Sequence, residues 1–145
     1  MEYQINPLWM GGLVRQISDN MVKIHLHGRL GVITVPREAI AFKGDLEPGH
    51  DIHFYFSYLQ VTDYPYEYDC TAMKQDGNMI PCLLGGKLTE VNDTAVKAEI
   101  VQNLGTIAVP RRWVFTPVKL EIGQYVEFYF SSIKATEKRE AIRGV

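Results

Sequence analysis

All four histidines of this 145-residue chain lie in its first half, and two of them have a spacing that suits chemistry. His25 and His27 are two positions apart in an alternating apolar and polar run, so on a β-strand they would share one face. Paired imidazoles can hold a metal ion, but no cysteine or acidic residue stands at a suitable ligand spacing. His50 and His53 belong to a later turn and strand. The sequence therefore predicts no metal site and no cofactor.

Cations cluster around the two histidines. Such cations can follow the phosphates of an oligonucleotide, and a histidine can stack on a base. The alternative is a solvated strand face with ordinary charges. The residues that we take as candidates for nucleic-acid contact are Arg15, Lys23, His25, His27, Arg29, Arg37, Lys97, Arg111 and Arg112.

Catalytic motifs are missing from the sequence. It has no phosphate-binding loop, dinucleotide fingerprint, nucleophile elbow or HExxH motif. No serine or cysteine is joined to a histidine by a known local signature. We therefore expect a binding protein and no enzyme.

The elements that would carry these residues come from an internal duplication. Residues 7–62 align with residues 81–136 without a gap, and about 20 of the roughly 56 positions are identical. The matches include "GG", "LG", "VPR" and "FYFS". Fixed-offset similarity of this kind marks a repeated structural module. We place the first copy at 1–75 and the second at 76–145.

Each copy has the period of a half-buried strand. Val22, Ile24 and Leu26 alternate with polar residues, and so do Val126, Phe128 and Phe130. Turn residues separate the runs, and the segments 69–75 and 139–144 supply a fifth strand to each copy. We expect sixteen buried positions: Ile17, Val22, Ile24, Ile33, Val35, Ile52, Phe54, Phe56, Val91, Val96, Ala98, Ile107, Val109, Val126, Phe128 and Phe130. The sequence thus predicts an all-β fold of two tandem five-stranded small barrels, since closure removes exposed strand edges.

The order of glycines, strands and turns resembles the S1-like family of the OB fold. The likeness lies in "GLVRQISDNMVKIHLHGRLGVITVPREAI" and "GKLTEVNDTAVKAEIVQNLGTIAVPRRWV", each followed by a "FYFS" strand. It covers most of the chain, twice, and its motif is loose, so a pair of SH3-like barrels is the alternative. The chain departs from the family where bases stack, because Met21 and Ala95 occupy the usual aromatic positions.

The resemblance implies binding of single-stranded RNA or another oligonucleotide on the face of the second and third strands. The first copy is the better candidate, because Glu99 and Val101 replace its histidines in the second. The alternative function is a protein-interaction or scaffolding unit, since tyrosines are enriched in interfaces. Its residues would be Tyr64, Tyr66 and Tyr68 of the junction, together with Trp113.

The composition limits the setting. The net charge is only −2, so bulk charge does not draw the protein to nucleic acid. The first residues lack the apolar run of a signal peptide, and no stretch has the roughly 20 apolar residues of a membrane helix. Two cysteines, Cys70 and Cys82, are too few for a disulfide framework. We expect a cytoplasmic protein with reduced thiols and no membrane partner.

Overall fold

The computed structural model describes residues 5–63, 68 and 80–138, and over this part of the chain the protein is all-β. The predicted fold class is confirmed at that level. Twelve strands form one sheet, joined by short turns of 3-10 helix. No helix among the described residues has the length and apolar character needed to span a lipid bilayer.

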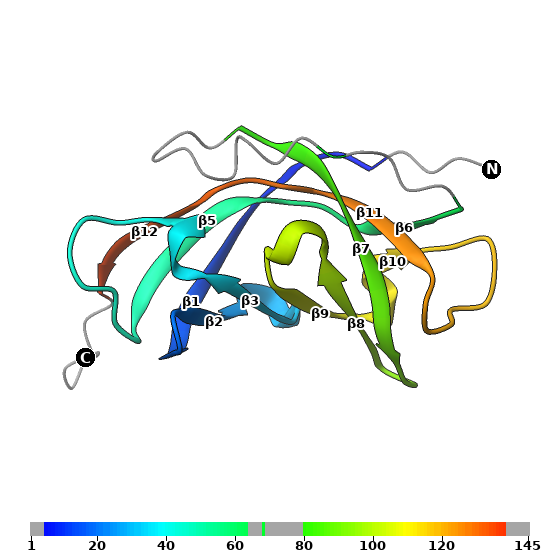
Figure 1. Ribbon diagram of the computed structural model, residues 1–145, viewed down its shortest axis with the longest axis horizontal. Coiled ribbons are helices and arrows are strands. Elements are labelled where there is room, and N and C mark those ends of the chain that lie inside the picture. Colours follow the sequence, from blue (N-terminus) through cyan, green and yellow to red (C-terminus); the bar gives the residue numbers. More distant parts are fainter. Residues whose placement is uncertain (1–4, 64–67, 69–79, 139–145) are drawn as a thin grey trace.

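Both copies contain the same series of strands (Figure 1). In the first copy these are β1 (Leu8–Ser18), β2 (Met21–Leu26), β3 (Val32–Pro36), β4 (Ile40–Ala41), β5 (His50–Phe56) and β6 (Leu59–Thr62). In the second they are β7 (Cys82–Val91), β8 (Ala95–Ile100), β9 (Thr106–Pro110), β10 (Val114–Phe115), β11 (Tyr125–Phe130) and β12 (Ile133–Lys138). The 3-10 turns are η1 (His27–Arg29), η2 (Arg37–Ala39), η4 (Val101–Asn103) and η5 (Arg111–Trp113).

Local sequence explains the first hairpin of each copy. Asp19 and Asn20 take positive φ angles of 51° and 63° between β1 and β2, as residues of this type do in tight hairpin turns. In the second copy the side chain of Asn92 stabilises the equivalent turn, because its Oδ1 accepts hydrogen bonds from the backbone N–H groups of Thr94 and Ala95. Strands β1 and β7 each carry a bulge, which lies at Arg15 and Thr89.

The core follows the predicted alternation. All of the expected positions are buried except Ile17 and Val91, which are partly buried. These two are equivalent positions, and each lies near the end of its strand, next to the hairpin turn. The center of the core is aromatic, because Phe54, Phe56, Phe128 and Phe130 pack together with ring centroids 5.1 to 6.1 Å apart.

The two copies exchange their last described strands. Strand β6 pairs with β11 of the second copy, and β12 pairs with β5 of the first. The short strands β4 and β10 extend this exchange, because β4 lies parallel to β12 and β10 lies parallel to β6. In Figure 1 the β5–β6 and β11–β12 segments run in opposite directions across the top of the molecule. One sheet therefore joins both copies.

The exchange obeys a pseudo-two-fold relation. Ile33 of β3 pairs with Ile107 of β9, and Phe56 of β5 pairs with Phe130 of β11. In the repeat alignment Ile107 is the equivalent of Ile33, and Phe130 is the equivalent of Phe56. Each of these residues thus faces its own counterpart. The pseudo-two-fold axis passes through both pairs.

Two repeated motifs lie on this contact between the copies. The serine of each "FYFS" is fully buried, and its hydroxyl accepts a hydrogen bond from the other copy: Ser57 from the Tyr129 N–H and Ser131 from the Tyr55 N–H, both at 2.8 Å. The glycine of each "LG" packs on the other copy as well. A methyl group built on Gly31 would overlap the Ala108 carbonyl, and one on Gly105 would overlap the Thr34 carbonyl.

The division into two separate five-stranded barrels is not confirmed, because each copy uses a strand of the other. The proposed boundary near residue 75 and the expected fifth strands at 69–75 and 139–144 lie outside the described residues. The strands that follow "FYFS", β6 and β12, were not expected from the sequence.

Candidate nucleic-acid interface

Strand β2 holds the predicted histidine face. Lys23 and His25 point outward and are exposed, because the alternate residues Val22, Ile24 and Leu26 are buried. His27 opens the turn η1 and is also exposed. Arg29 ends that turn with a φ of 58°, again exposed. The cations of this strand and turn are therefore all accessible to solvent, as the sequence predicts for an outward face.

The charge of this surface acts on His25. Its pKa is lowered below the usual 6.5, first by partial desolvation and then by the positive charges of Arg15 and Lys23. Arg15 reaches the same surface from the bulge in β1, where an extra residue re-aims the strand. Positive charges that repel one another in the free protein create a positive potential, and this potential attracts an anionic ligand.

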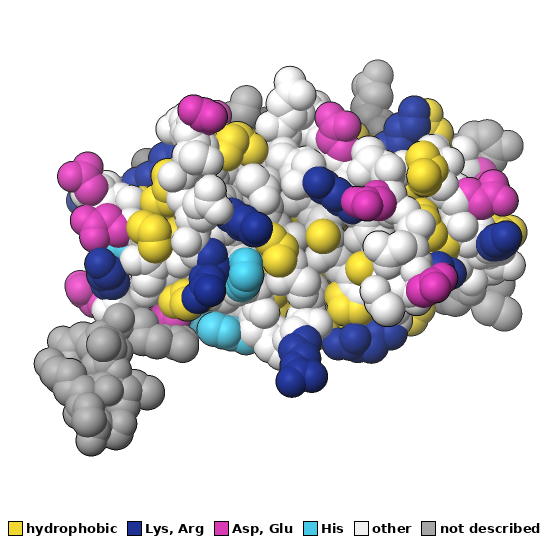
Figure 2. All heavy atoms as spheres, turned by 90° about the horizontal axis from the view of Figure 1, so that it is seen from below, with side chains coloured by type: hydrophobic (Ala, Val, Ile, Leu, Met, Phe, Trp, Pro, Cys, Tyr) yellow, Lys and Arg dark blue, Asp and Glu magenta, His cyan; other side chains and the backbone are white. Residues whose placement is uncertain are grey.

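A further cation comes from the second copy. Arg112 of η5 donates a hydrogen bond of 3.2 Å from its Nη2 to the Arg29 carbonyl. This contact crosses the boundary between the copies and places two arginines together. In Figure 2 histidines lie beside Lys and Arg side chains on the face of the first copy, with acidic side chains toward its outer edge, and cationic and acidic side chains alternate over the second copy.

The pseudo-two-fold relation allows the charges of the two copies to be compared at equivalent positions. The basic face of the first copy, which we define as Arg15, Lys23, His25, His27, Arg29 and Arg112, has a counterpart on the other half. The equivalent residues are Thr89, Lys97, Glu99, Val101, Asn103 and Glu38. Four fixed positive charges on one side thus correspond to one positive and two negative charges on the other. Over these six described pairs of positions, the side of the first copy is therefore basic and the equivalent side is not.

The two arginines of "VPR" use their side chains in turns. Arg37 donates to the carbonyls of Ile40 at 2.7 Å and Phe42 at 3.1 Å, and Arg111 donates to the Asn92 carbonyl at 2.8 Å. These bonds hold the loops that follow or face the third strand of each copy. Their repetition is explained by structure without a ligand.

An aromatic platform adjoins the basic face, and sequence reasoning missed it. Trp9 at the start of β1 is 56% exposed, although it is a large apolar side chain. Its ring stacks on His53 of β5, with centroids 5.5 Å apart and planes 7° apart, and it meets the Tyr55 ring edge-on at 5.0 Å. The stretch "PLWMGG" lacks a clear alternation of apolar and polar residues, so the sequence did not predict that Trp9 would be exposed.

Gly11 connects this platform to the histidines of β2. It pairs with His53 across β1 and β5. A methyl group on Gly11 would lie 3.0 Å from Cδ2 of His27 and 3.5 Å from Cδ2 of His53. The absence of a side chain therefore lets both imidazoles lean over the strand. On the far side of β5, Lys134 of β12 is exposed and pairs with His53.

The described residues contain no cluster of three histidine, cysteine or acidic side chains that could hold a metal ion. The gathered histidines offer ring surfaces on which a base of an oligonucleotide can stack.

The candidates for a protein interface have different positions. Tyr64 and Tyr66 lie outside the described residues, as does Cys70. Tyr68 donates a hydrogen bond of 2.8 Å to the buried Glu127 carboxylate. Trp113 is only 7% exposed, stacks on Tyr58 at 3.8 Å and donates to the Ser57 carbonyl. Its contacts lie within the molecule, between the copies.

A scan of the chain against models of protein families found no match, and a search of curated proteins found none. The likeness to S1-like barrels therefore rests on the sequence motif alone.

Proposed function

We propose that this protein binds single-stranded RNA or another single-stranded oligonucleotide, without catalysis, on the basic face of its first copy. The observation that carries the proposal is the exposed Trp9–His53 stack beside that face. Proteins that bind single strands combine a positive surface for the backbone with aromatic rings for the bases. The first copy has both, and the resemblance to S1-like barrels supports the same function.

The geometry suggests how a strand would lie. Arg15, Lys23, Arg29 and Arg112 would meet phosphates, while Trp9 offers an open ring face to a base. His27 and His53 lie between these two groups above Gly11. Because the contacts are to phosphates and ring faces, we expect little preference for base sequence.

A second candidate function, a protein-interaction unit, is favoured by one observation on the second copy. Val118 and Ile122 of the loop between β10 and β11 are 55% and 68% exposed. The equivalent positions of the first copy are Gly44 and Pro48, so this apolar surface belongs to one copy only. This function would be favoured if the protein bound a protein partner with an affinity that does not depend on salt and had no affinity for oligonucleotides.

Alanine at Trp9 should weaken the binding of a fluorescent single-stranded RNA about tenfold, because stacking on an aromatic ring contributes on the order of 1–3 kcal/mol per base. Fluorescence anisotropy at low salt measures the affinity. Leu83→Ala, at the equivalent position of β7, is the control and should leave it unchanged. Equal affinity for wild type and Trp9→Ala would contradict the proposed platform.

The affinity should also fall with salt. Four phosphate contacts predict a slope of log K against log salt near −3, since single strands give about −0.7 for each contact. Replacing Arg29 and Arg112 together by glutamine should halve this slope. The equivalent double change, Asn103→Ala with Glu38→Gln, should not lower it. A slope near zero in the wild type would refute phosphate binding by this face.

Acidification should strengthen binding through His25. In the free protein its pKa is below 6.5, because desolvation, Arg15 and Lys23 disfavour the cation, whereas a bound phosphate would raise it. Binding would then take up a proton, so the affinity rises as the pH falls through the His25 pKa of the complex and levels off below the lowered pKa of the free protein. From pH 8 to 5.5 we expect a gain of about three- to tenfold. His25→Asn should flatten that gain and Glu99→Gln should preserve it; a wild-type affinity that does not change with pH would count against the assignment.

A further inference from the structure

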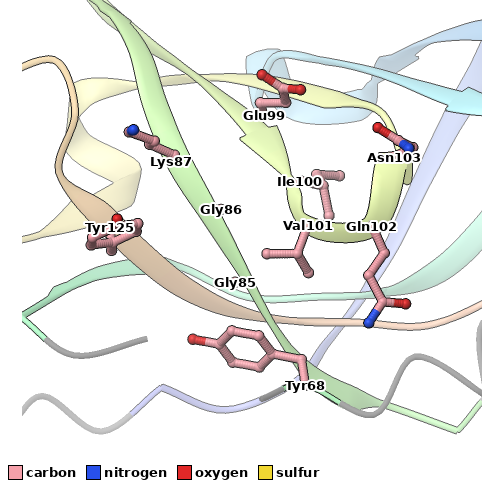
Figure 3. Close-up of a pocket in the computed structure, with 10 residues that line it drawn as sticks. All are labelled: Tyr68, Gly85, Gly86, Lys87, Glu99, Ile100, Val101, Gln102, Asn103 and Tyr125. Atoms are coloured by element: carbon pink, nitrogen blue, oxygen red, sulfur yellow. The ribbon is translucent and has the colours of Figure 1, made fainter. Parts of the chain in front are cut away.

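The second copy has a cavity at the place where the first copy carries its histidines. Its volume is about 560 Å³, within the roughly 300–1,000 Å³ range of small-molecule sites. It lies over the Gly85–Gly86 stretch of β7, and Figure 3 shows the side chains around it: Val101 and Gln102 from η4, Tyr125 from β11, and Tyr68 on the opposite side.

Two substitutions between the copies open this cavity. In the first copy, His27 and His53 cover Gly11. Their equivalents in the second copy are Val101, which is shorter, and Glu127, which is buried and accepts the Tyr68 hydroxyl. Tyr68 therefore lies against Gly85 with its ring fixed at one wall. At the equivalent place in the first copy, the imidazoles of His27 and His53 lie over Gly11 instead.

The walls combine flat apolar surfaces with polar groups at the rim. Tyr68, Tyr125 and Val101 supply the apolar surfaces. The Gln102 amide extends from a turn residue with a φ of 57°, so a left-handed backbone aims it at the cavity. Such a site fits a planar ring with hydrogen-bonding groups on its edge.

One cation stands at the rim. The Lys87 ammonium lies 5.9 Å from the center of the Tyr125 ring. Glu99 faces Lys87 across β7 and β8, but the only ion pair between described residues is Lys138 with Glu47. Lys87 can therefore meet an anionic group attached to the planar ring.

We infer that this cavity binds one nucleotide, with its base between the tyrosines, its edge on Gln102 and its phosphate on Lys87. The inference rests on the proposed function, because it makes the cavity a second site for units of the same strand. It adds an open cavity that holds a single base and contacts its edge, whereas the first copy offers ring faces on its surface.

The four ribonucleoside 5′-monophosphates, titrated into the full-length protein by calorimetry, test the inference. We expect saturable binding of at least one, weakened about tenfold by Tyr125→Ala, since one ring is lost from the stack. Lys87→Gln should weaken the monophosphate and leave the matching nucleoside unchanged. Asp51→Ala, at the equivalent position of Tyr125 in the first copy, is the control and should bind as wild type does.

The outcomes separate this inference from the proposed function. RNA binding that is weakened about tenfold in Trp9→Ala, with unchanged monophosphate binding, supports both sites. Monophosphate binding that depends on Tyr125, in a protein with no affinity for RNA, supports the cavity and refutes the strand-binding function. The inference is overturned if no monophosphate binds at concentrations up to roughly 10 mM. It is also overturned if binding is unaffected by Tyr125→Ala.

Discussion

Alanine at Gly31 is expected to lower the unfolding midpoint by roughly 12 °C, which corresponds to about 4 kcal/mol in a chain of this size. Gly31 has a φ of 110°, and an added methyl group would overlap the Ala108 carbonyl of β9. The backbones of the two copies would have to separate there, next to the Ile33–Ile107 pair. Gly105→Ala, which meets the Thr34 carbonyl in the same way, should have a similar effect.

Gly44 provides a matched control for backbone strain. Its φ is 107°, but a methyl group there would meet only the tip of the Phe42 ring, at 3.9 Å. Gly44→Ala should therefore cost only the strain of the left-handed conformation, about 1–2 kcal/mol. Thermal unfolding followed by circular dichroism gives both values. If Gly31→Ala were no more destabilising than Gly44→Ala, the close approach of the copies would be refuted.

Neither copy should fold alone as a monomer. A chain cut between residues 69 and 79 would leave β5 without β12 in one half and β11 without β6 in the other. It would also leave a part-buried N–H at Tyr55 and at Tyr129 without the serine of the other copy. Unpaired buried donors and open sheet edges are both costly. We expect the two halves, mixed, to form a folded one-to-one complex.

Size-exclusion chromatography with light scattering, together with circular dichroism, checks this expectation. A single half should be unfolded, or should pair with a second copy of itself about a true two-fold. Full-length protein cut at the same place by an inserted protease site is the control, since its halves begin in contact. A single half that unfolds cooperatively as a monomer would contradict the exchange of strands.

The sequence predicted the core and the longer alternating strands of each copy, because both depend on local pattern, but it did not predict β6 and β12. Alternation placed Ile24, Phe54 and Phe128 inside, and the structure agrees. The exchange could not be predicted in this way. The copies share their motifs, and β11 is the equivalent of β5. The sequence of β6 therefore suits pairing with β5 of its own copy nearly as well as pairing with β11 of the other copy. Alternation gives no preference between the two partners.

The candidate site was predictable where charge alone defines it. Lys23 and His25 follow from their spacing on β2, whereas His27 lies in the turn after that strand, and Arg112 joins them only through the fold. Trp9 was missed because its run holds apolar residues on both sides, and its exposure depends on the pairing of β1 with β5. Arg37 carried a charge that suits phosphate, yet local carbonyls occupy its guanidinium.

The pseudo-two-fold relation has a consequence for how the surface can vary. Joining two equivalent halves in one chain replaces a meeting of separate molecules with a high effective concentration, so assembly no longer depends on the amount of protein. The halves are then inherited as a fixed pair and need not stay alike. Residues that face their counterparts, such as Phe56 and Phe130, remain bound to fit each other. Outward positions carry no such requirement, so equivalent residues such as His25 and Glu99 can differ in charge on the same framework.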